Sequence, residues 1–240
     1  MIRTYNYRLF TNATQDSALD RLLWRSRNVY NAALAQRKNA WEGEKRGVTY
    51  AQQWAHFRDE RNANPDTLGV LNATSMQQLL RRLDKAFGAF YRRCKRGDTP
   101  GYPRFKRRSR FKSIEYRHGD GCKLRFDKEG RALFYVQNVG EVKVKYHRPV
   151  PEGATIKHVV VKRVLDKWFV SLMLELPDAE PVNVPTDCVG IDVGLTSLLA
   201  LSDGQLVENP RWLRRSLAKL RRAQRRMSRR TKGSGGWQKA

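Results

Sequence analysis

One carboxylate in the sequence is flanked by glycines in a way that suggests chemistry. Asp192 lies between Gly190 and Gly194, where the apolar stretch 188–191 ends and shortly before a second apolar run, 197–201. This pattern predicts a buried strand, a tight hairpin and a partner strand. A buried acid is costly unless a cation or donor meets it, and glycine leaves room for a phosphate or metal ion near the backbone. Asp192 is therefore a candidate metal ligand; the alternative is a structural acid at a strand end.

A second group of suitable residues lies in the segment 91–112, which carries ten basic residues and one acidic residue. Arg and Lys contact phosphates, and the aromatic rings among them can stack on bases or pack on the protein. A solvated basic loop is the alternative. The interrupting prolines and glycines predict a shaped loop instead, which favours nucleic-acid binding. The candidate binding residues are Arg104, Lys106, Arg107 and Arg108.

The C-terminal segment 211–240 has twelve basic residues and no acidic residue. An apolar stripe at helical spacing predicts a helix up to about residue 230, rather than a disordered basic tail. The glycine-rich run 233–236 should break it. Like charges four residues apart weaken an isolated helix, so this helix is expected to need an anionic partner. Its candidate binding residues are Arg221, Arg222, Arg225 and Arg226.

The net charge limits the classes of partner. The 240 residues include 48 Lys and Arg against 23 Asp and Glu, which gives a net charge of +25 and a pI of about 10.6. An ordinary enzyme of small metabolites needs no such excess, because self-repulsion destabilises the compact state. The six Trp, nine Tyr and nine Phe favour nucleic acid over a membrane surface. No apolar run reaches the ~18 residues of a membrane span, and the N-terminus has no signal-peptide core.

The cysteines and histidines form no recognisable ligand pattern. Cys94, Cys122 and Cys188 are odd in number and far apart, with no C-x-x-C pair. They predict neither a disulfide framework nor a zinc site, and the four scattered histidines have no ligand spacing either. We expect buried or incidental thiols in a reducing cytoplasm.

The first part of the chain predicts a strand followed by three helices. Alternating aromatic and polar residues indicate a strand within 1–10. Asn12 or Thr14 is expected to cap the first helix, Asn72 to cap the third, and Gly97 to end it. The three helices are expected over residues 12–41, 50–62 and 73–96.

Residues 113–176 predict an all-β segment. A hairpin is expected to pair 156–165 with 168–176 across Asp166 and Lys167. Several short strands at regular spacing, together with the first strand, suggest a small barrel, which makes the fold class α+β. The proline-containing segment 177–185 is expected to link this barrel to a second domain.

Six short segments together resemble the TnpB family, also called OrfB-like transposases. These are transposon-encoded RNA-guided DNA nucleases related to the type V CRISPR effectors. Each segment alone is weak, but their order and spacing are specific and cover essentially the whole chain. The segments are 27–31 (Arg-Asn-Val-Tyr-Asn), 101–106 (Gly-Tyr-Pro-Arg-Phe-Lys), 190–195 (Gly-Ile-Asp-Val-Gly-Leu), 209–210, 220–226 and 228–230.

The resemblance implies an arrangement of domains. A wedge-type β-barrel would comprise residues 1–10 and 98–180, interrupted by a helical recognition insertion at 11–97. Residues 187–240 would be the first segment of a RuvC-like nuclease domain, an α/β domain of the RNase H type. The family likeness also implies a prokaryotic, cytoplasmic and nucleoid-associated protein.

The resemblance also implies a mechanism, in which Asp192 is one of three carboxylates holding two Mg²⁺ ions for cleavage of double-stranded DNA. The barrel and basic segments would grip a guide RNA derived from the transposon end. Tyr50, Thr74 and Gln77 match positions that read a short motif beside the target DNA. Guide pairing would select the rest of the target.

The sequence departs from the family pattern in one respect. The second catalytic Glu, the C-x-x-C zinc ribbon and the last Asp lie further along the family chain than residue 240. One carboxylate cannot hold two Mg²⁺ ions, so we expect this chain to bind nucleic acid without cutting it alone. For the same reason residues 187–240 should expose apolar surface.

Three interpretations remain open from the sequence. The chain is part of an RNA-guided endonuclease, or it is a nuclease-dead RNA-guided DNA-binding module or decayed transposase remnant. In the third, residues 190–196 are the first phosphate loop of an actin-like ATPase. The last is disfavoured, because those sequences normally begin with this strand, whereas here a basic barrel precedes it.

Overall fold

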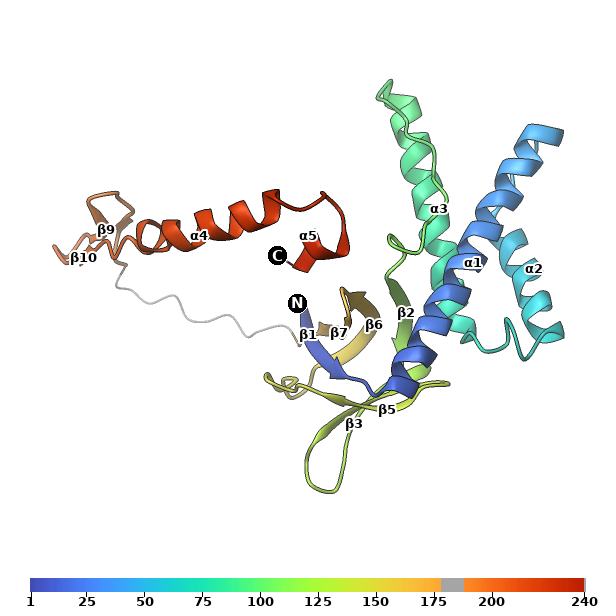
Figure 1. The fold of residues 1–240 in the computed structure, drawn as a ribbon, viewed down its shortest axis with the longest axis horizontal. Coiled ribbons are helices and arrows are strands. Elements are labelled where there is room, and N and C mark those ends of the chain that lie inside the picture. Colours follow the sequence, from blue (N-terminus) through green and yellow to red (C-terminus); the bar gives the residue numbers. More distant parts are fainter. Residues whose placement is uncertain (178–187, 240) are drawn as a thin grey trace. The chain divides into compact units, whose positions relative to one another are not determined.

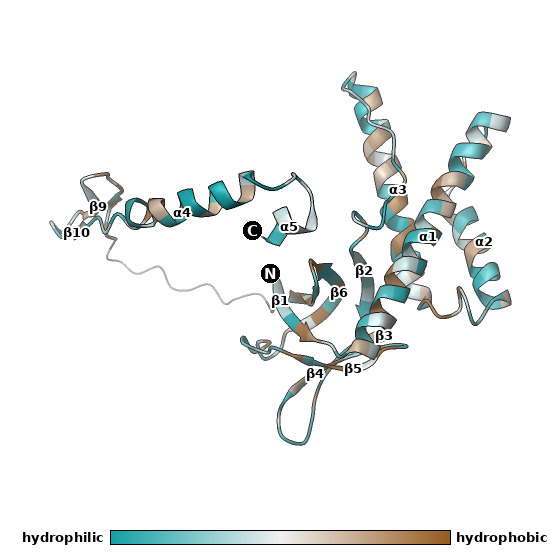
Figure 2. Cartoon of the chain, viewed as in Figure 1, coloured by the Kyte–Doolittle hydropathy of each residue, from teal (hydrophilic) through white to brown (hydrophobic). Residues whose placement is uncertain are grey.

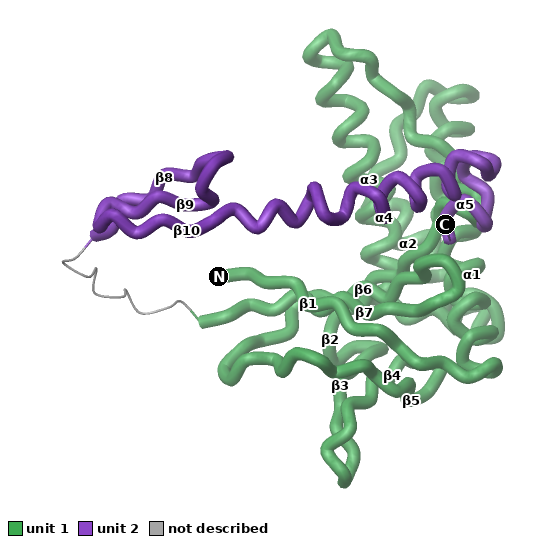
Figure 3. Tube along the Cα trace, turned by 60° about the vertical axis from the view of Figure 1, so that its left-hand side comes forward, with its two compact units in different colours: residues 1–178 green, residues 179–240 purple. Residues whose placement is uncertain are grey.

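The computed structural model describes residues 1–177 and 188–239. The chain forms two compact units, residues 1–178 and 179–240 (Figure 3). The segment 177–185, expected to be a linker, lies almost wholly outside the described residues.

The first unit contains a closed β-barrel, as the sequence predicts (Figure 1). Around the barrel the strands follow the order β1-β5-β4-β3-β2-β6-β7. The strands are β1 (Ile2–Phe10), β2 (Ser113–His118), β3 (Gly121–Phe126), β4 (Ala132–Val136), β5 (Gly140–Val144), β6 (Thr155–Val164) and β7 (Lys167–Glu175).

Strand β1 closes the barrel because it has two partners. Most of its length pairs antiparallel with β7, from Ile2 opposite Glu175 to Leu9 opposite Trp168, and its end pairs with β5. The alternation read from the sequence sends every second side chain inward. Tyr7 is fully buried, and its hydroxyl donates to the Arg148 carbonyl at 2.8 Å. Burial raises the pKa of Tyr7 to about 12.

The β6–β7 hairpin turns one residue earlier than the sequence predicts. Lys167 already belongs to β7 and pairs with Val164, so the turn falls at Leu165 and Asp166. Leu165 adopts a left-handed backbone with φ 58°, which is uncommon for an apolar side chain. The register places Trp168 inside the fold, where its indole nitrogen donates to Asp16 at 2.6 Å.

Three helices follow β1, and the first and third have capping residues expected from the sequence. Asn12 and Thr49 each form a capping box, and Asn72 accepts from the Ser75 backbone at 3.0 Å. Gly97 ends the last helix with φ 72°. The first two helices run slightly further than predicted. The three are α1 (Ala13–Glu44), α2 (Tyr50–Ala63) and α3 (Ala73–Arg96).

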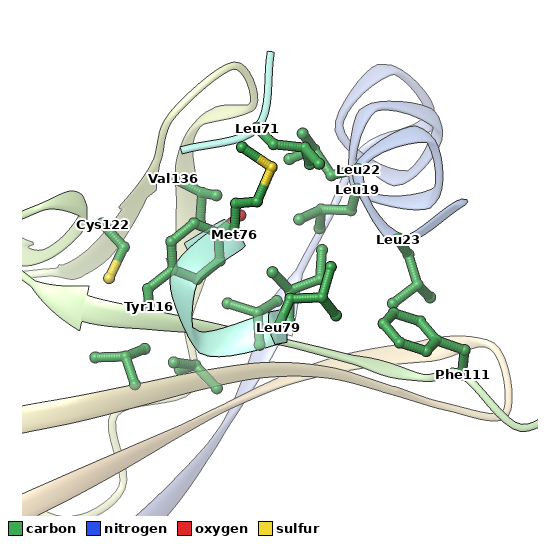
Figure 4. Packing of buried hydrophobic residues seen from close by; sticks show 14 of the residues in the cluster. Leu19, Leu22, Leu23, Leu71, Met76, Leu79, Phe111, Tyr116, Cys122 and Val136 are labelled. Carbon is green, nitrogen blue, oxygen red and sulfur yellow. The ribbon is translucent and has the colours of Figure 1, made fainter. Parts of the chain in front are cut away.

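The helices and the barrel share one hydrophobic core (Figure 4). Leu19 of α1 and Met76 of α3 are both buried, and they pack together with Tyr116 and Val136 of the barrel. Ion pairs reinforce this contact: Asp20 of α1 binds Arg163 of β6, and Arg82 of α3 binds Glu115 of β2. The helical insertion is therefore held rigidly to the barrel. In Figure 2 the apolar residues of α1 and α3 lie along the sides where the helices face each other.

The second unit is a small sheet followed by helices. Strands β8 (Ile191–Asp192), β9 (Ser197–Leu201) and β10 (Leu206–Glu208) form an antiparallel sheet in the order β10-β9-β8. Helix α4 (Trp212–Ser228) follows. Helix α4 already ends before the glycine-rich run 233–236 that was expected to break it. Helix α5 (Gly235–Lys239) begins within that run. In the described residues no helix is long and apolar enough to cross a membrane.

The predicted burial of the Asp192 strand is wrong. Ile191 is 62% exposed and Leu195 91% exposed, and α4 buries none of its described residues. The hairpin was expected to be a core strand because it is apolar, but among the described residues no second layer covers the sheet. Within the described part of this unit, residues 188–239, the expected exposed apolar surface is present.

The fold class predicted from the sequence is confirmed. The chain is α+β, with a small β-barrel that is interrupted after its first strand by helices and followed by a strand–helix unit.

Candidate functional site

Asp192 ends the short strand β8 and pairs with Ala200 of β9. Its flanking glycines serve the hairpin itself. A Cβ on Gly194 would lie 3.0 Å from the Ser197 carbonyl oxygen, which is tighter than ordinary contact. The Gly190 backbone amide donates to the Ser202 hydroxyl at 2.9 Å. At Gly190 a Cβ would only reach ordinary contact with the Ser202 side chain, at 3.4 Å, so the tight approach is confined to Gly194. The interpretation that the two glycines make room for a ligand stays a prediction.

The described residues do not by themselves supply a complete metal site. Across residues 1–177 and 188–239 there is no group of three or more His, Cys, Asp or Glu side chains that could hold a metal ion. Mg²⁺ requires near-octahedral oxygen coordination, and Asp192 offers a single exposed carboxylate.

Asn209 connects the Asp192 hairpin to the basic helix. Its side-chain nitrogen donates to the Leu195 carbonyl at 3.0 Å, and its side-chain oxygen accepts from the Arg211 backbone amide at 3.0 Å. Arg211 begins α4 in a left-handed conformation, with φ 48° and no side-chain cap of its own. Asn209 thus determines how the chain leaves the loop after Asp192 and enters α4.

The basic helix α4 presents its cations to solvent. Arg221, Arg222, Arg225 and Arg226 are all exposed, and none has an acidic partner among the described ion pairs. Arginines four residues apart repel each other along the helix. A polyanion would relieve that repulsion; that this helix needs an anionic partner stays a prediction.

The basic segment between α3 and β2 is a shaped loop held at several points, as its prolines and glycines predict. At its start the Arg93 guanidinium donates to the carbonyls of Pro100 and Gly101. The Tyr102 ring then packs edge-on against the rings of Phe87 and Phe90, with distances between ring centres of 5.5 Å and 5.3 Å.

Asn31 of α1 holds the middle of this loop. Its side-chain oxygen accepts from the Lys106 backbone amide at 2.8 Å, and its side-chain nitrogen donates to the Lys106 carbonyl at 3.1 Å. The Lys106 ammonium lies 5.8 Å from the centre of the Tyr30 ring, and the buried Phe111 ring packs beside Tyr30. Asn31 was not among the predicted site residues, although it closes the 27–31 segment of the family resemblance.

These anchors display the rest of the loop outward. Arg104 and Arg107 are exposed, with no side-chain partner among the described residues. The Arg108 side chain is 82% exposed, and its guanidinium nitrogen Nη2 forms a long ion pair, at 3.8 Å, with Asp20 Oδ2. Phe105 is 51% exposed. Of the four predicted cations, two are engaged by the protein itself: Lys106 lies over the Tyr30 ring, and Arg108 pairs with Asp20.

Tyr50, Thr74 and Gln77 lie along one side of the helical insertion. Thr74 lies in the first turn of α3, Gln77 follows one turn later, and Arg81 continues the same row at helical spacing. The Arg81 guanidinium lies 5.7 Å from the centre of the Tyr50 ring, which brings α2 into the row. Arg81 was missed from the sequence because only the fold places it against Tyr50.

Asp120, at the β2–β3 turn, fixes the N-terminal end of this row. The Thr74 hydroxyl donates to one of its carboxylate oxygens, and the Asn72 side-chain amide donates to the other at 2.8 Å. These two hydrogen bonds hold the pKa of Asp120 below its ordinary value, and the bond from Thr74 has the larger effect. Asp120 also escaped prediction, because nothing near it in sequence marks it as special.

Two families match parts of the chain. Residues 171–240 match the OrfB_IS605 family described as "Probable transposase", and residues 1–46 match the associated family described as "Helix-turn-helix domain". Over residues 1–46 the structure contains a strand followed by one long helix.

Two curated proteins are similar over nearly the whole chain. A "Putative RNA-guided DNA endonuclease" of Streptomyces pristinaespiralis is 36% identical over 241 residues, covering 99% of this chain and 57% of that protein. The "Putative RNA-guided DNA endonuclease InsQ" of Escherichia coli K12 is 28% identical over 240 residues, covering 99% and 56%. The chain therefore spans little more than half the length of these relatives.

Among solved structures, a CRISPR-Cas12f ternary complex determined by cryo-EM aligns over 92% of this chain and 55% of that chain. The TM-score is 0.44 at 14% sequence identity, a likeness too low to bear on function.

Proposed function

Because this chain is a TnpB-like member of the OrfB family, we propose that it binds a guide RNA and target DNA and contributes Asp192 to a RuvC-type nuclease centre. The observation that carries the binding part is the anchored basic loop, since Asn31 and the Tyr102 ring hold a segment in which Arg104 and Arg107 are exposed to solvent. A preorganised row of cations loses less conformational entropy on binding phosphates than a mobile one does. The names of both relatives support RNA and DNA as the partners.

The domains follow the family pattern. Residues 1–10 and 98–180 form the wedge-type barrel, residues 11–97 the helical recognition insertion, and residues 187–240 the first segment of the RuvC-like domain. Within this arrangement the guide RNA lies on the barrel and the basic loop. The protein acts in the prokaryotic cytoplasm, beside the nucleoid.

Tyr50, Thr74 and Gln77 read the motif beside the target. Support comes from their position in a single row on a rigid part of the fold, with Thr74 oriented by Asp120. A glutamine side chain matches the paired donor and acceptor of adenine in the major groove. A threonine that has donated its proton to a carboxylate offers lone pairs only, so it reads a donor on the base.

Asp192 is the proposed metal ligand, and Mg²⁺ bound there would activate the water that attacks a phosphodiester. Because the described residues do not form the rest of such a site, we assign no cleavage step to this chain by itself. Further carboxylates are needed beside Asp192 before any cut. Until they are supplied, the chain behaves as a nuclease-dead, RNA-guided DNA-binding module, which is also how a transposase remnant would behave.

The test is to measure binding of a transposon-end RNA to the purified chain, and Mg²⁺-dependent cleavage of target DNA, side by side. We expect salt-dependent RNA binding and no cleavage, with Asp192→Ala binding as tightly as the wild type. Failure to bind RNA at low salt would reject the proposed function. Cleavage that disappears in Asp192→Ala would instead overturn the inactivity of the chain alone.

A further inference from the structure

An aromatic cleft of about 780 Å³ opens in the helical part of the first unit. Tyr102 of the basic loop lines it, but none of the loop's candidate cations, Arg104, Lys106, Arg107 and Arg108, does. It lies between the C-terminal halves of α1 and α3 and the start of α2, and Figure 1 shows these ends of α1 and α3 projecting away from the barrel. Six aromatic side chains line it: Trp41, Tyr50, Phe87, Phe90, Tyr91 and Tyr102.

The rings form a floor and two open walls. Phe87 is only 4% exposed and forms the floor, with the Tyr102 ring standing edge-on to it at 5.5 Å. Trp41 from α1 is 56% exposed and Tyr91 from α3 is 55% exposed. Single exposed apolar residues are ordinary, but large aromatic faces gathered around one cleft mark a binding site. Flat walls favour a flat ligand.

One acidic side chain gives the cleft a polar contact. Asp84 lines it, with one carboxylate oxygen bound to the Arg37 guanidinium at 2.8 Å and the side chain 51% exposed. Arg37 is itself held by Gln53 at 2.7 Å and stacks over the Phe87 ring. Asp84 therefore keeps a fixed place in the cleft and retains lone pairs that can accept from an N–H group of a ligand.

Cations follow the cleft residue Tyr91 along α3, and another lines the cleft itself. The last turn of α3 carries Arg93, Lys95 and Arg96, and Arg46 lines the cleft from the α1–α2 connection. Lys95 and Arg96 have no acidic partner among the described ion pairs. An apolar peptide side chain would use the rings but leave these charges unused. A nucleotide matches both features, because its base is planar with N–H donors and its phosphate is anionic.

We propose that this cleft takes a single unpaired nucleobase extruded from bound nucleic acid, stacked against Trp41 and Tyr91 with its phosphate at the cations of the α3 end. The inference rests on the proposed function only in requiring that the chain binds nucleic acid. It adds a site for one base between the basic loop, which contributes Tyr102, and the row from Thr74 to Tyr50, which contributes Tyr50. The strand that supplies the base is RNA or DNA, which the experiment distinguishes.

The test uses short single-stranded oligonucleotides carrying one 2-aminopurine, in RNA and in DNA form, titrated with the intact chain. Stacking in the cleft should quench the fluorescence of the 2-aminopurine. Trp41→Ala and Tyr91→Ala should each weaken binding about tenfold and abolish most of the quenching, since stacking one base on a ring contributes on that order. Tyr91→Phe, which keeps the ring, should behave like the wild type.

Trp24→Ala is the matched control. Trp24 also lies on α1 and is 53% exposed, but it does not line the cleft. A parallel titration replaces the central base with an abasic sugar, which keeps every phosphate. We expect the abasic strand to bind the wild type as weakly as the intact strand binds Trp41→Ala. Circular dichroism of each variant checks that the helices are retained.

The failures of the two proposals are distinguishable. If no oligonucleotide binds the wild type at low salt, the proposed function fails. The base site is rejected and the function stands if oligonucleotides bind with strong salt dependence but two affinities are unchanged. These are the affinity of the abasic strand for the wild type, compared with the intact strand, and the affinity of the intact strand for Trp41→Ala, compared with the wild type. A concentration-dependent dimer that Trp41→Ala disrupts, without any effect on oligonucleotides, would assign the cleft to a second copy of the chain and also reject the base site.

Discussion

Thr74 donates its hydroxyl proton to the carboxylate of Asp120, which joins the first turn of α3 to the β2–β3 turn of the barrel. The contact bridges residues 46 apart in sequence. Asn72, the cap of the same helix, donates to the other carboxylate oxygen, so Asp120 receives two hydrogen bonds from one helix end. Asp120 therefore helps to fix the orientation of α3 on the barrel, and with it the row of Thr74, Gln77 and Arg81, beside the shared core and the Arg82–Glu115 ion pair.

Replacement of Asp120 by Asn should destabilise the first unit by about 1 kcal/mol at neutral pH. An amide oxygen can accept from only one of the two donors, and its NH₂ group must then face the other. Thr74→Val is the matched variant, because it removes one donor and keeps the shape of the side chain. Urea unfolding of both single variants and the double variant measures the coupling. If the loss of unfolding free energy in the double variant equals the sum of the losses in the two single variants, the Thr74–Asp120 contact adds nothing to stability.

The same contact predicts a pH dependence. The folded-state pKa of Asp120 is lowered, so its contribution to stability is present above the ordinary Asp value of about 3.9 and is lost as the pH falls through the folded value. The stability difference between wild type and Asp120→Asn should therefore be largest near neutral pH and shrink in acid. The pKa of Asp127 is also lowered, but Asp127 is present in both proteins, so its contribution cancels in the stability difference. A difference that stays constant down to pH 3 would contradict the assignment.

Asn31 should control the affinity of the basic loop without contributing charge. Asn31→Ala removes both hydrogen bonds to the Lys106 backbone, so the loop must be ordered on binding and RNA affinity should fall several-fold. The slope of log K against log salt should stay unchanged, because no cation is removed. Arg107→Ala should instead reduce that slope by about 0.7 for single-stranded RNA.

Filter binding at several salt concentrations separates the two effects. Asn28→Ala is the control, because Asn28 lies one turn earlier on α1 and its side chain accepts from Arg27 rather than from the loop. An Asn31→Ala variant with wild-type affinity would mean that the loop needs no anchoring by α1.

Local chemistry explains why the helices were predictable. Asn12, Thr49 and Asn72 satisfy backbone amides within three residues of themselves, and Gly97 adopts a left-handed conformation that residues with a Cβ adopt less readily. These are short-range rules that the sequence displays directly. The β6–β7 turn was misplaced because barrel closure sets the register there, with Trp168 opposite Leu9 of β1, so Leu165 takes the positive φ.

The site was only partly predictable for a related reason. Charge and aromatic content identified Arg104 and Arg107, but Asn31 contacts Lys106 across 75 residues of sequence, and Arg81 reaches Tyr50 from another helix. Such pairings follow from packing rather than from local pattern. Asp192 shows the opposite error. Its apolar neighbours predict burial, yet a strand is buried only where a second layer covers it, and the described residues supply none.

Cys122 should resist thiol reagents while the protein is folded. It is 1% exposed, and burial raises its pKa to about 12, so almost no thiolate is present at pH 8. Cys94 and Cys188 are exposed and should react rapidly with Ellman's reagent. We expect the third thiol to appear only in denaturant, and Cys122→Ala to remove it. A third thiol that reacts in the native protein as fast as Cys94 would show that this part of the barrel opens readily.

Asn209 makes a prediction about the Asp192 hairpin that proteolysis can test. Its side chain holds Leu195 on one side and the Arg211 amide on the other, while the hairpin and α4 have little burial to protect them. Cleavage by chymotrypsin and trypsin should therefore fall within residues 188–239 before it reaches 1–177.

Asn209→Ala should speed cleavage both near Leu195 and at the start of α4. Asn209→Asp keeps an oxygen for the Arg211 amide but cannot donate to Leu195, so it should speed cleavage near Leu195 alone. Equal resistance of residues 188–239 and of the barrel, or identical cleavage patterns for the two variants, would show that the hairpin is held by something other than Asn209.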